Sequence, residues 1–193
     1  MFKHIKIITA VAIAGINLMA CGDTKSKKDP KNQAKEINDS IKKANPSASV
    51  KSEDAEFLAK AGYAGVKEIK SSEAIKAVTK NADVIAFADM MVKEHTAMGD
   101  RIKAMANPSV KNVAIQKDLN EEDQDDVDDF KTDRDADKDY AAMMVKDHER
   151  VVKLFEQGDK TVTDADIKAF ISDVLPKLRA HLDHAKELRD KLK

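Results

Sequence analysis

The chain has 193 residues, of which 36% are charged and 4% are aromatic, and its formal net charge is -1. This near balance of charge excludes a strongly basic surface for nucleic acid, so we expect no nucleic-acid partner. Few aromatic residues, 6 glycines and 4 prolines favour helices over strands, because strands are rich in aromatic and β-branched residues. The length is sufficient for one domain with its own core.

Residues 1–20 have the pattern of a bacterial lipoprotein signal peptide. A basic start, MFKHIK, precedes the apolar run IITAVAIAGINLMA, which is too short to cross a bilayer comfortably. The run leads into LMAC, which resembles the bacterial lipobox and implies cleavage before Cys21 and attachment of lipid to it. Cys21 is the only cysteine, so it has no partner for an internal disulfide. We therefore expect a lipid anchor in the cell envelope, at the outer membrane or the periplasmic face, with the cell surface as an alternative.

Residues 21–52 follow the signal peptide and are rich in lysine, serine and asparagine, with almost no apolar content. A segment of this composition cannot bury enough surface to fold. We predict a flexible tether that reaches roughly 30 Å from the lipidated cysteine. The folded domain is then expected to comprise residues 53–193.

Four amphipathic helices are predicted in this domain, because apolar positions recur at spacings of three and four residues. Ser52, Asn81 and Thr163 precede three of them, and each is of a type that caps helix N termini. Gly158 is the expected end of the third helix, and Pro176 is expected to kink or break the fourth. The predicted ranges are 53–79, 82–106, 136–157 and 164–191.

A long connection, residues 107–135, separates the second and third predicted helices. Residues 118–139 contain twelve acidic residues and three basic ones, which indicates a solvated acidic segment. Within it, residues 119–132 are expected to dock as a short helix. One long connection at this place is typical of a ferritin-like bundle, in which the second and third helices run parallel. The predicted fold class is therefore all-α, with a ferritin-like four-helix bundle.

Four segments resemble the successive motifs of a bacterial protein family. They are EFLAKAGYAGVKEI, FADMMVKEHTAM, DKDYAAMMVKDHERVVKLFEQG and IKAFISDVLPKLRAHLDHAKEL, and they span about residues 54–190. In order and spacing they are similar to the domain of unknown function 4142 family, whose members are secreted or lipid-anchored. The resemblance implies a ferritin-like fold and an envelope location, and it brings no activity with it.

Two of these segments repeat one phrase, MMVKEH and MMVKDH, each ending in a histidine. On a helical wheel these two histidines and one in the fourth helix lie on apolar faces, as does a glutamate in the first helix. Each helix thus directs one metal-ligand side chain towards the core, an arrangement that helical bundles use for metals. We predict a transition-metal site formed by Glu68, His95, His148 and His181.

The four predicted ligands all face the core, but their positions along the bundle axis agree less well. Counted from the predicted turns at 1.5 Å per residue, Glu68 and His95 lie within a few Å of each other, which predicts that they pair. His148 and His181 differ by ~10 Å in the same count, unless the fourth helix is broken.

Met91 and Met144 stand one helical turn before two of the histidines, and their soft sulfur atoms would suit copper. Methionine is also a common filler of apolar cores, and both interpretations stay open. The Glu-x-x-His pairs of di-iron bundles are missing at His95 and His148, so we expect no oxidase or ferroxidase. The sequence contains no nucleophile–base pair and no glycine-rich phosphate loop. We therefore expect a binding protein rather than an enzyme, with no cofactor implied beyond a transition metal.

Two functions are compatible with these features. The first is a lipid-anchored envelope protein that binds a transition metal in the core of its bundle. The second is a metal-free structural or stress-related envelope protein, in which the histidines serve packing and each has a hydrogen-bond partner. The membrane, reached through lipid on Cys21, is the one expected partner, and the sequence identifies no protein partner.

Overall fold

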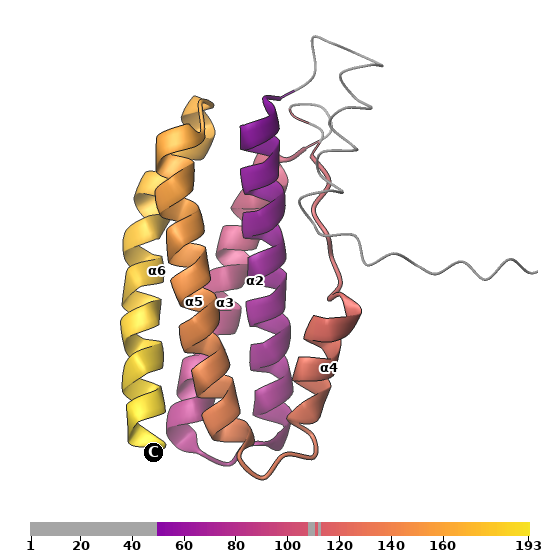
Figure 1. The fold of residues 1–193 in the computed structure, drawn as a ribbon, viewed down its shortest axis with the longest axis vertical. Coiled ribbons are helices and arrows are strands. Elements are labelled where there is room, and N and C mark those ends of the chain that lie inside the picture. Colours follow the sequence, from indigo (N-terminus) through magenta and orange to yellow (C-terminus); the bar gives the residue numbers. More distant parts are fainter. Residues whose placement is uncertain (1–49, 108–110, 112) are drawn as a thin grey trace, which may run out of the picture.

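The computed structural model describes residues 50–107, 111 and 113–193. The predicted signal peptide, Cys21 and nearly all of the predicted tether lie outside these residues. The described part of the chain forms five α-helices and no strand, as the all-α prediction required (Figure 1). None of these helices is both long and apolar enough to cross a membrane. The helices are α2 (Ser52–Val78), α3 (Ala82–Met105), α4 (Glu121–Asp129), α5 (Ala136–Thr161) and α6 (Ala165–Lys191).

The four long helices pack side by side as a helical bundle (Figure 1). α2 packs against α3 and α5, and α6 packs against the same two helices, so α3 and α5 lie diagonally opposite. The ion pairs Asp83–Lys191 and Arg101–Asp173 show that α3 and α6 are antiparallel. Since α5 and α6 form a hairpin, α3 and α5 run parallel, as the long connection predicted.

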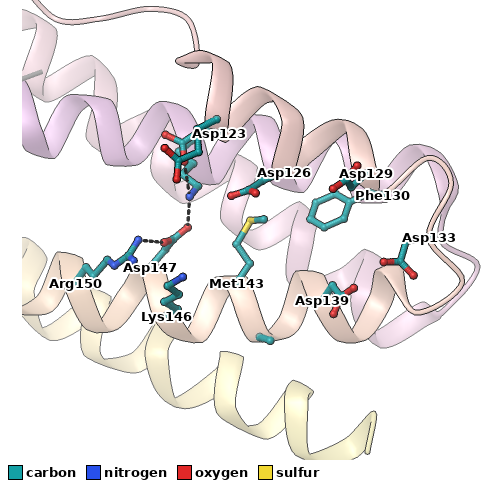
Figure 2. Close-up of a pocket in the computed structure, with 13 residues that line it drawn as sticks. Asp123, Asp126, Asp129, Phe130, Asp133, Asp139, Met143, Lys146, Asp147 and Arg150 are labelled. Carbon is teal, nitrogen blue, oxygen red and sulfur yellow. Dashed lines mark hydrogen bonds and ion pairs between the residues drawn. The ribbon is translucent and has the colours of Figure 1, made fainter. Parts of the chain in front are cut away.

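α4 belongs to the long connection and lies on the outside of α2 (Figure 1). The side chain of Asn120 caps α4 by accepting a hydrogen bond of 2.8 Å from the backbone amide of Asp123. Val127 and Phe130 are buried, so the acidic segment docks through its few apolar residues, within the predicted range 119–132. Figure 2 shows α4 beside the first half of α5, with a pocket between them lined mainly by acidic residues.

The first two helix starts were predicted with different success. Asn81 caps α3 as expected, and its side chain accepts the amide of Asp83 at 2.9 Å. The prediction that Ser52 caps the first helix is wrong, because Ser52 is already the first residue of α2. Lys51 holds the capping position, without a hydrogen bond from its side chain.

The connection between α5 and α6 differs more from the prediction. α5 passes through Gly158 and ends at Thr161, so the expected stop at Gly158 is wrong. Thr163 does not cap α6, because its amide and hydroxyl donate to the buried carboxylate of Asp54 at 2.8 and 3.2 Å. Asp164 caps α6 instead, by accepting the amides of its first turn. The turn therefore lies later in the chain than predicted, which changes the register of the two helices.

Pro176 lies inside α6, which is continuous through it, so the predicted break is wrong. Proline removes one hydrogen bond to the carbonyl four residues earlier. Both Pro176 and Ser172, which carries that carbonyl, are exposed. The missing bond thus falls on the solvent side of the helix, where its cost is small.

The core consists of two apolar clusters with a polar layer between them. One cluster contains Phe155 and the other contains Tyr140. On each long helix, the residues of one cluster precede and those of the other follow a buried polar side chain. These side chains, each at most 3% exposed, are Glu68, His95, His148 and His181.

Gly158→Ala is expected to destabilise the protein by about 1–3 kcal/mol, because overpacking a core costs this much. An added Cβ would lie 2.6 Å from the ring of Phe57. The matched control is Gly99→Ala, where a Cβ meets nothing within 4 Å and should stabilise the helix by up to about 1 kcal/mol. Urea unfolding followed by circular dichroism measures both changes, and equal effects would contradict the close approach of α2 and α5.

Candidate metal centre

Three buried histidines meet in the polar layer, one each from α3, α5 and α6. The ring centroids of His95 and His148 are 5.5 Å apart, and His181 lies 5.2 Å from the first and 5.6 Å from the second. One ligand nitrogen from each ring lies within 4.8 Å of the others. In the part of the chain that the structure describes, these three side chains form the group that could hold a metal ion.

His148 and His181 meet at one level, and the predicted offset of ~10 Å between them is wrong. The predicted count began at Gly158, whereas α5 continues to Thr161. Moving the turn to residues 162–164 reduces the offset to about 4–5 Å, which side-chain reach can bridge.

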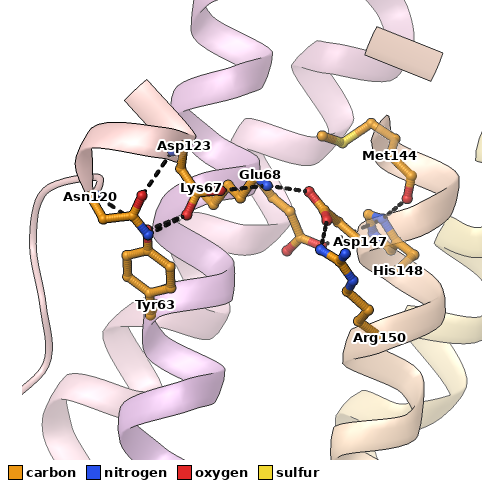
Figure 3. A network of polar contacts seen from close by, with 9 residues as sticks. All are labelled: Tyr63, Lys67, Glu68, Asn120, Asp123, Met144, Asp147, His148 and Arg150. Carbon is orange, nitrogen blue, oxygen red and sulfur yellow. Dashed lines mark hydrogen bonds and ion pairs between the residues drawn. The ribbon is translucent and has the colours of Figure 1, made fainter. Parts of the chain in front are cut away.

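His148 and His181 each have one nitrogen beside an oxygen atom and one nitrogen free. Nδ1 of His148 lies 2.9 Å from the backbone carbonyl of Met144 (Figure 3). Nε2 of His181 lies 2.8 Å from a carboxylate oxygen of Glu94. The other nitrogens, Nε2 of His148 and Nδ1 of His181, have no hydrogen-bond partner among the described residues. This division between a held and an open nitrogen is typical of histidines that bind metals.

Glu68 lies against His95 and also contacts His148. Its Oε2 is 2.9 Å from Nδ1 of His95, and its Oε1 is 3.5 Å from Nδ1 of His148. Nε2 of His95 has no hydrogen-bond partner within the described ranges. Neither carboxylate oxygen accepts a well-directed hydrogen bond from a described residue, although Glu68 is only 1% exposed. The structure thus brings Glu68 to the Nδ1 side of two histidines, while their Nε2 atoms stay open.

The electrostatics of the layer suit a metal ligand set. Burial by itself raises the pKa of Glu68, but the charges of His95, His148 and His181 outweigh burial and lower the pKa to about 2. Burial lowers the pKa of His181 to about 4, with the neighbouring histidines adding to this effect and Glu94 opposing it. At pH 7 His181 is therefore neutral, the state in which imidazole binds a metal.

The acid that precedes each histidine of the repeated phrase contacts a different helix. Glu94 bonds to His181 on α6, whereas a carboxylate oxygen of Asp147 lies 3.2 Å from the ammonium group of Lys67 on α2. Glu94, Asp147 and Lys67 were not among the predicted site residues. A signal for the two acids was present, since the position before each histidine lies about 100° around the helix and faces a neighbouring helix.

Met91 and Met144 are fully buried and belong to the apolar cluster that contains Tyr140. The backbone carbonyl of Met144 contacts His148, so this residue takes part in the layer through its main chain. A role for either sulfur atom as a metal ligand stays a prediction, since methionine also fills apolar cores of this kind.

A family model described as domain of unknown function (DUF4142) matches residues 39–188, which is most of the chain and includes all four residues of the polar layer. The chain belongs to this family. The resemblance that the four sequence motifs indicated is thereby confirmed. No curated protein and no solved structure matches the chain. Membership in DUF4142 assigns no activity, so the function has to be argued from the polar layer itself.

The free energy of unfolding of the metal-free DUF4142 protein is expected to fall as the pH falls from about 6.5 to about 4. Over this range His181 takes up a proton in the unfolded chain but not in the folded protein, so acid favours the unfolded chain. The stabilisation from neutral His181 is fully present above pH 6.5. Below that pH, the free energy of unfolding falls by at most about 1.4 kcal/mol for each pH unit. Urea titrations with chelator at a series of pH values measure it.

The matched pair for this measurement is His181→Gln and His184→Gln. His184 lies on the same helix and is exposed, so its replacement should leave the pH profile as steep as in the parent. His181→Gln should flatten the profile between pH 6.5 and 4. Equally steep profiles in both variants would mean that His181 is not held neutral by its surroundings.

Proposed function

We propose that this DUF4142 protein binds a transition-metal ion at His95, His148 and His181. The observation that supports the proposal is the meeting of three imidazoles from three helices, each with one open nitrogen, in a buried layer. Buried nitrogens without partners cost about 1–3 kcal/mol each. A metal ion would give all three a partner at once.

The residues fit the coordination chemistry of several metals. Neutral imidazole suits zinc, copper, iron and nickel, and three histidines leave a fourth position of a tetrahedral site open. Metal–nitrogen bonds of about 2.0–2.1 Å place the nitrogens of such a site about 3.3 Å apart. One ligand nitrogen from each ring lies within 4.8 Å of the others, so the rings would have to approach by up to about 1.5 Å to bond one ion.

Two carboxylates of the proposed centre lie beside the ring nitrogens that would not bind the metal. Glu94 accepts from Nε2 of His181, and Glu68 lies beside Nδ1 of His95. Partners of this kind fix the orientation of a metal-bound imidazole and raise its basicity, and their loss typically weakens metal binding by 10–100-fold. In this proposal Glu68 positions the ligands and offsets part of the charge of the ion.

The fold supports the same proposal. A single long connection between α3 and α5, and the parallel course of these two helices, support the ferritin-like four-helix bundle. In bundles of this kind, inward-facing side chains of facing helices form metal sites at mid-height.

One observation favours a second candidate, a metal-free structural or stress-related envelope protein. Each of the three histidines already has an oxygen atom beside one nitrogen, as a histidine that serves packing would. Under this alternative, alanine at His95 or His148 lowers stability and leaves the metal content unchanged.

The full-length protein, exported to the periplasm and purified without chelator or histidine tag, is expected to contain metal at close to equimolar amounts. The His95→Ala/His148→Ala variant should contain none, while His184→Ala, at an exposed position, should retain it. Elemental analysis measures the content. Free metal at 100 times its Kd should raise the free energy of unfolding by about 2.7 kcal/mol in the parent and not in the double variant. A metal-free parent whose double variant melts earlier would support the packing alternative.

We also infer that lipid on Cys21 anchors the protein in the cell envelope. The support is the pattern of residues 1–21, an apolar run between a basic start and LMAC. Two or more acyl chains give stable anchoring.

Cys21→Ser is expected to move the protein from the membrane fraction to the soluble fraction, because it removes the acceptor of the lipid. Cell fractionation with immunoblotting measures this, and mass spectrometry of the N-terminal peptide should show the added acyl mass in the parent. Ser26→Ala, in the predicted tether, is the control that should stay with the membrane. A Cys21→Ser protein that also stays there would contradict the anchor.

A further inference from the structure

A surface groove lies between α4 and α5 and has a volume of about 410 Å³ (Figure 2). Acidic side chains from α4, from the following turn and from the start of α5 line most of it, and Lys146 and Arg150 lie towards one end. The carboxylates that define this acidic groove are those of Glu122, Asp126, Asp129, Asp133 and Asp139.

A second cavity lies next to the acidic groove and reaches the polar layer. It has a volume of about 180 Å³, is lined by residues of α2, α4 and α5, and includes Glu68 in its wall. Lys67, Asp123, Asp147 and Arg150 line both spaces, so the groove and this inner cavity meet at these residues. Together the two adjoining spaces lead from the surface towards the carboxylate that contacts His95, and Lys67 with its ion pairs forms the wall that they share.

Lys67 lines both spaces, and Figure 3 shows it between Asp123 and Asp147. Its ammonium nitrogen lies 2.7 Å from Asp123 on α4 and 3.2 Å from Asp147 on α5, so it joins the two helices on either side of the path. Asn120 and the hydroxyl of Tyr63 bond to the same Asp123. An arriving cation would compete with the ammonium group for both aspartates and could displace it.

The inner end of the path has features that point to a cation. Glu68 is 1% exposed and its oxygens accept no well-directed hydrogen bond from the described residues. It contacts Nδ1 of His95 and of His148, and the Nε2 atoms of the same two rings are open. The junction and the site are also neighbours along the chain, since Lys67 precedes Glu68 and Asp147 precedes His148. A displacement of Lys67 therefore acts directly on the residues that would receive the ion.

We propose that a divalent metal ion reaches the three histidines through the acidic groove and the inner cavity, past the ammonium group of Lys67. This inference rests on the proposed function, because the path requires a metal site at its end. Clustered carboxylates in a groove raise the local concentration of cations and speed their association. At the inner end of the path, the carboxylate of Glu68 attracts the ion towards the histidines.

A rival route leads through a cavity of about 20 Å³ that is lined by residues of all four long helices and also touches Glu68 and His95. Gly65 and Gly99 form part of its wall, and the space beside both glycines is open. The rest of its lining is apolar, and Glu68 is the only acid in it. This route has no group of surface carboxylates in its lining that would attract a cation from solution. The test distinguishes it from the acidic groove.

The test measures the rate at which the metal-free full chain takes up Zn²⁺, by stopped-flow competition with a chromogenic chelator. Asp126→Asn/Asp129→Asn removes two exposed charges of the acidic groove and should slow association roughly five-fold, with little change in dissociation. Asp183→Asn/Glu187→Gln removes two exposed charges from α6 and should leave the rate within experimental error. High salt should reduce the difference between the two variants.

A second pair of variants tests the inner cavity. Ala64→Leu places a larger side chain in its wall and should slow association and dissociation by similar factors, with the affinity unchanged. Ala97→Leu adds the same bulk at an exposed position of α3 and should change neither rate.

The outcomes separate the route from the site. A parent that binds Zn²⁺ at equal rates in the groove variant, the Ala64→Leu variant and their controls would overturn the proposed path and leave the metal site standing. Slowing by Gly99→Leu alone would overturn it in favour of a route through the cavity beside Gly99. A parent that binds no Zn²⁺ would overturn the proposed function itself.

Discussion

The contact between the carboxylate of Glu68 and the rings of His95 and His148 is the interaction on which the other features of the core depend. A carboxylate that is 1% exposed is costly unless positive or polar groups surround it. The four long helices must therefore keep a register that holds Glu68 at the level of the histidines. The apolar clusters above and below the layer fix that register through their packing, so the two ends of the bundle maintain the geometry of its middle.

The same layer extends sideways to the surface through residues next to the site in the chain. Lys67 precedes Glu68 on α2 and pairs with Asp147 beside His148, and Glu94 beside His95 pairs with His181. The repeated phrase thus does two things in each copy. Its histidine faces the centre of the bundle, and its acid ties the helix to a neighbour. Through Asp123 this network also holds α4, whose acidic sequence gives it few apolar contacts of its own.

The sequence predicted the features that depend on local spacing and missed those that depend on distant partners. The helices and the cap at Asn81 follow from residues within a few positions of one another, and they agree with the structure. Thr163 fails as a cap because Asp54, 109 residues away, takes its amide and hydroxyl. Gly158 was taken for a stop because glycine often ends helices, whereas here it gives room to the ring of Phe57 from another helix.

The candidate site shows the same division. The face of each ligand could be predicted from the helical wheel, because side-chain direction follows from position within one helix. The height of His181 relative to His148 could not, because it depends on the end of α5 at Thr161. The hydrogen bond of Glu94 to His181 was equally invisible, since it joins residues 87 positions apart.

The most direct test of the metal centre is a crystal structure of the protein with Zn²⁺, with anomalous scattering recorded to locate the ion. We expect one ion bonded at about 2.0–2.1 Å to Nε2 of His95, Nε2 of His148 and Nδ1 of His181. Glu68 should remain on the Nδ1 side of His95, outside bonding distance of the ion. Zinc in the acidic groove alone, or bound by Glu68 in place of one of the histidines, would contradict this expectation.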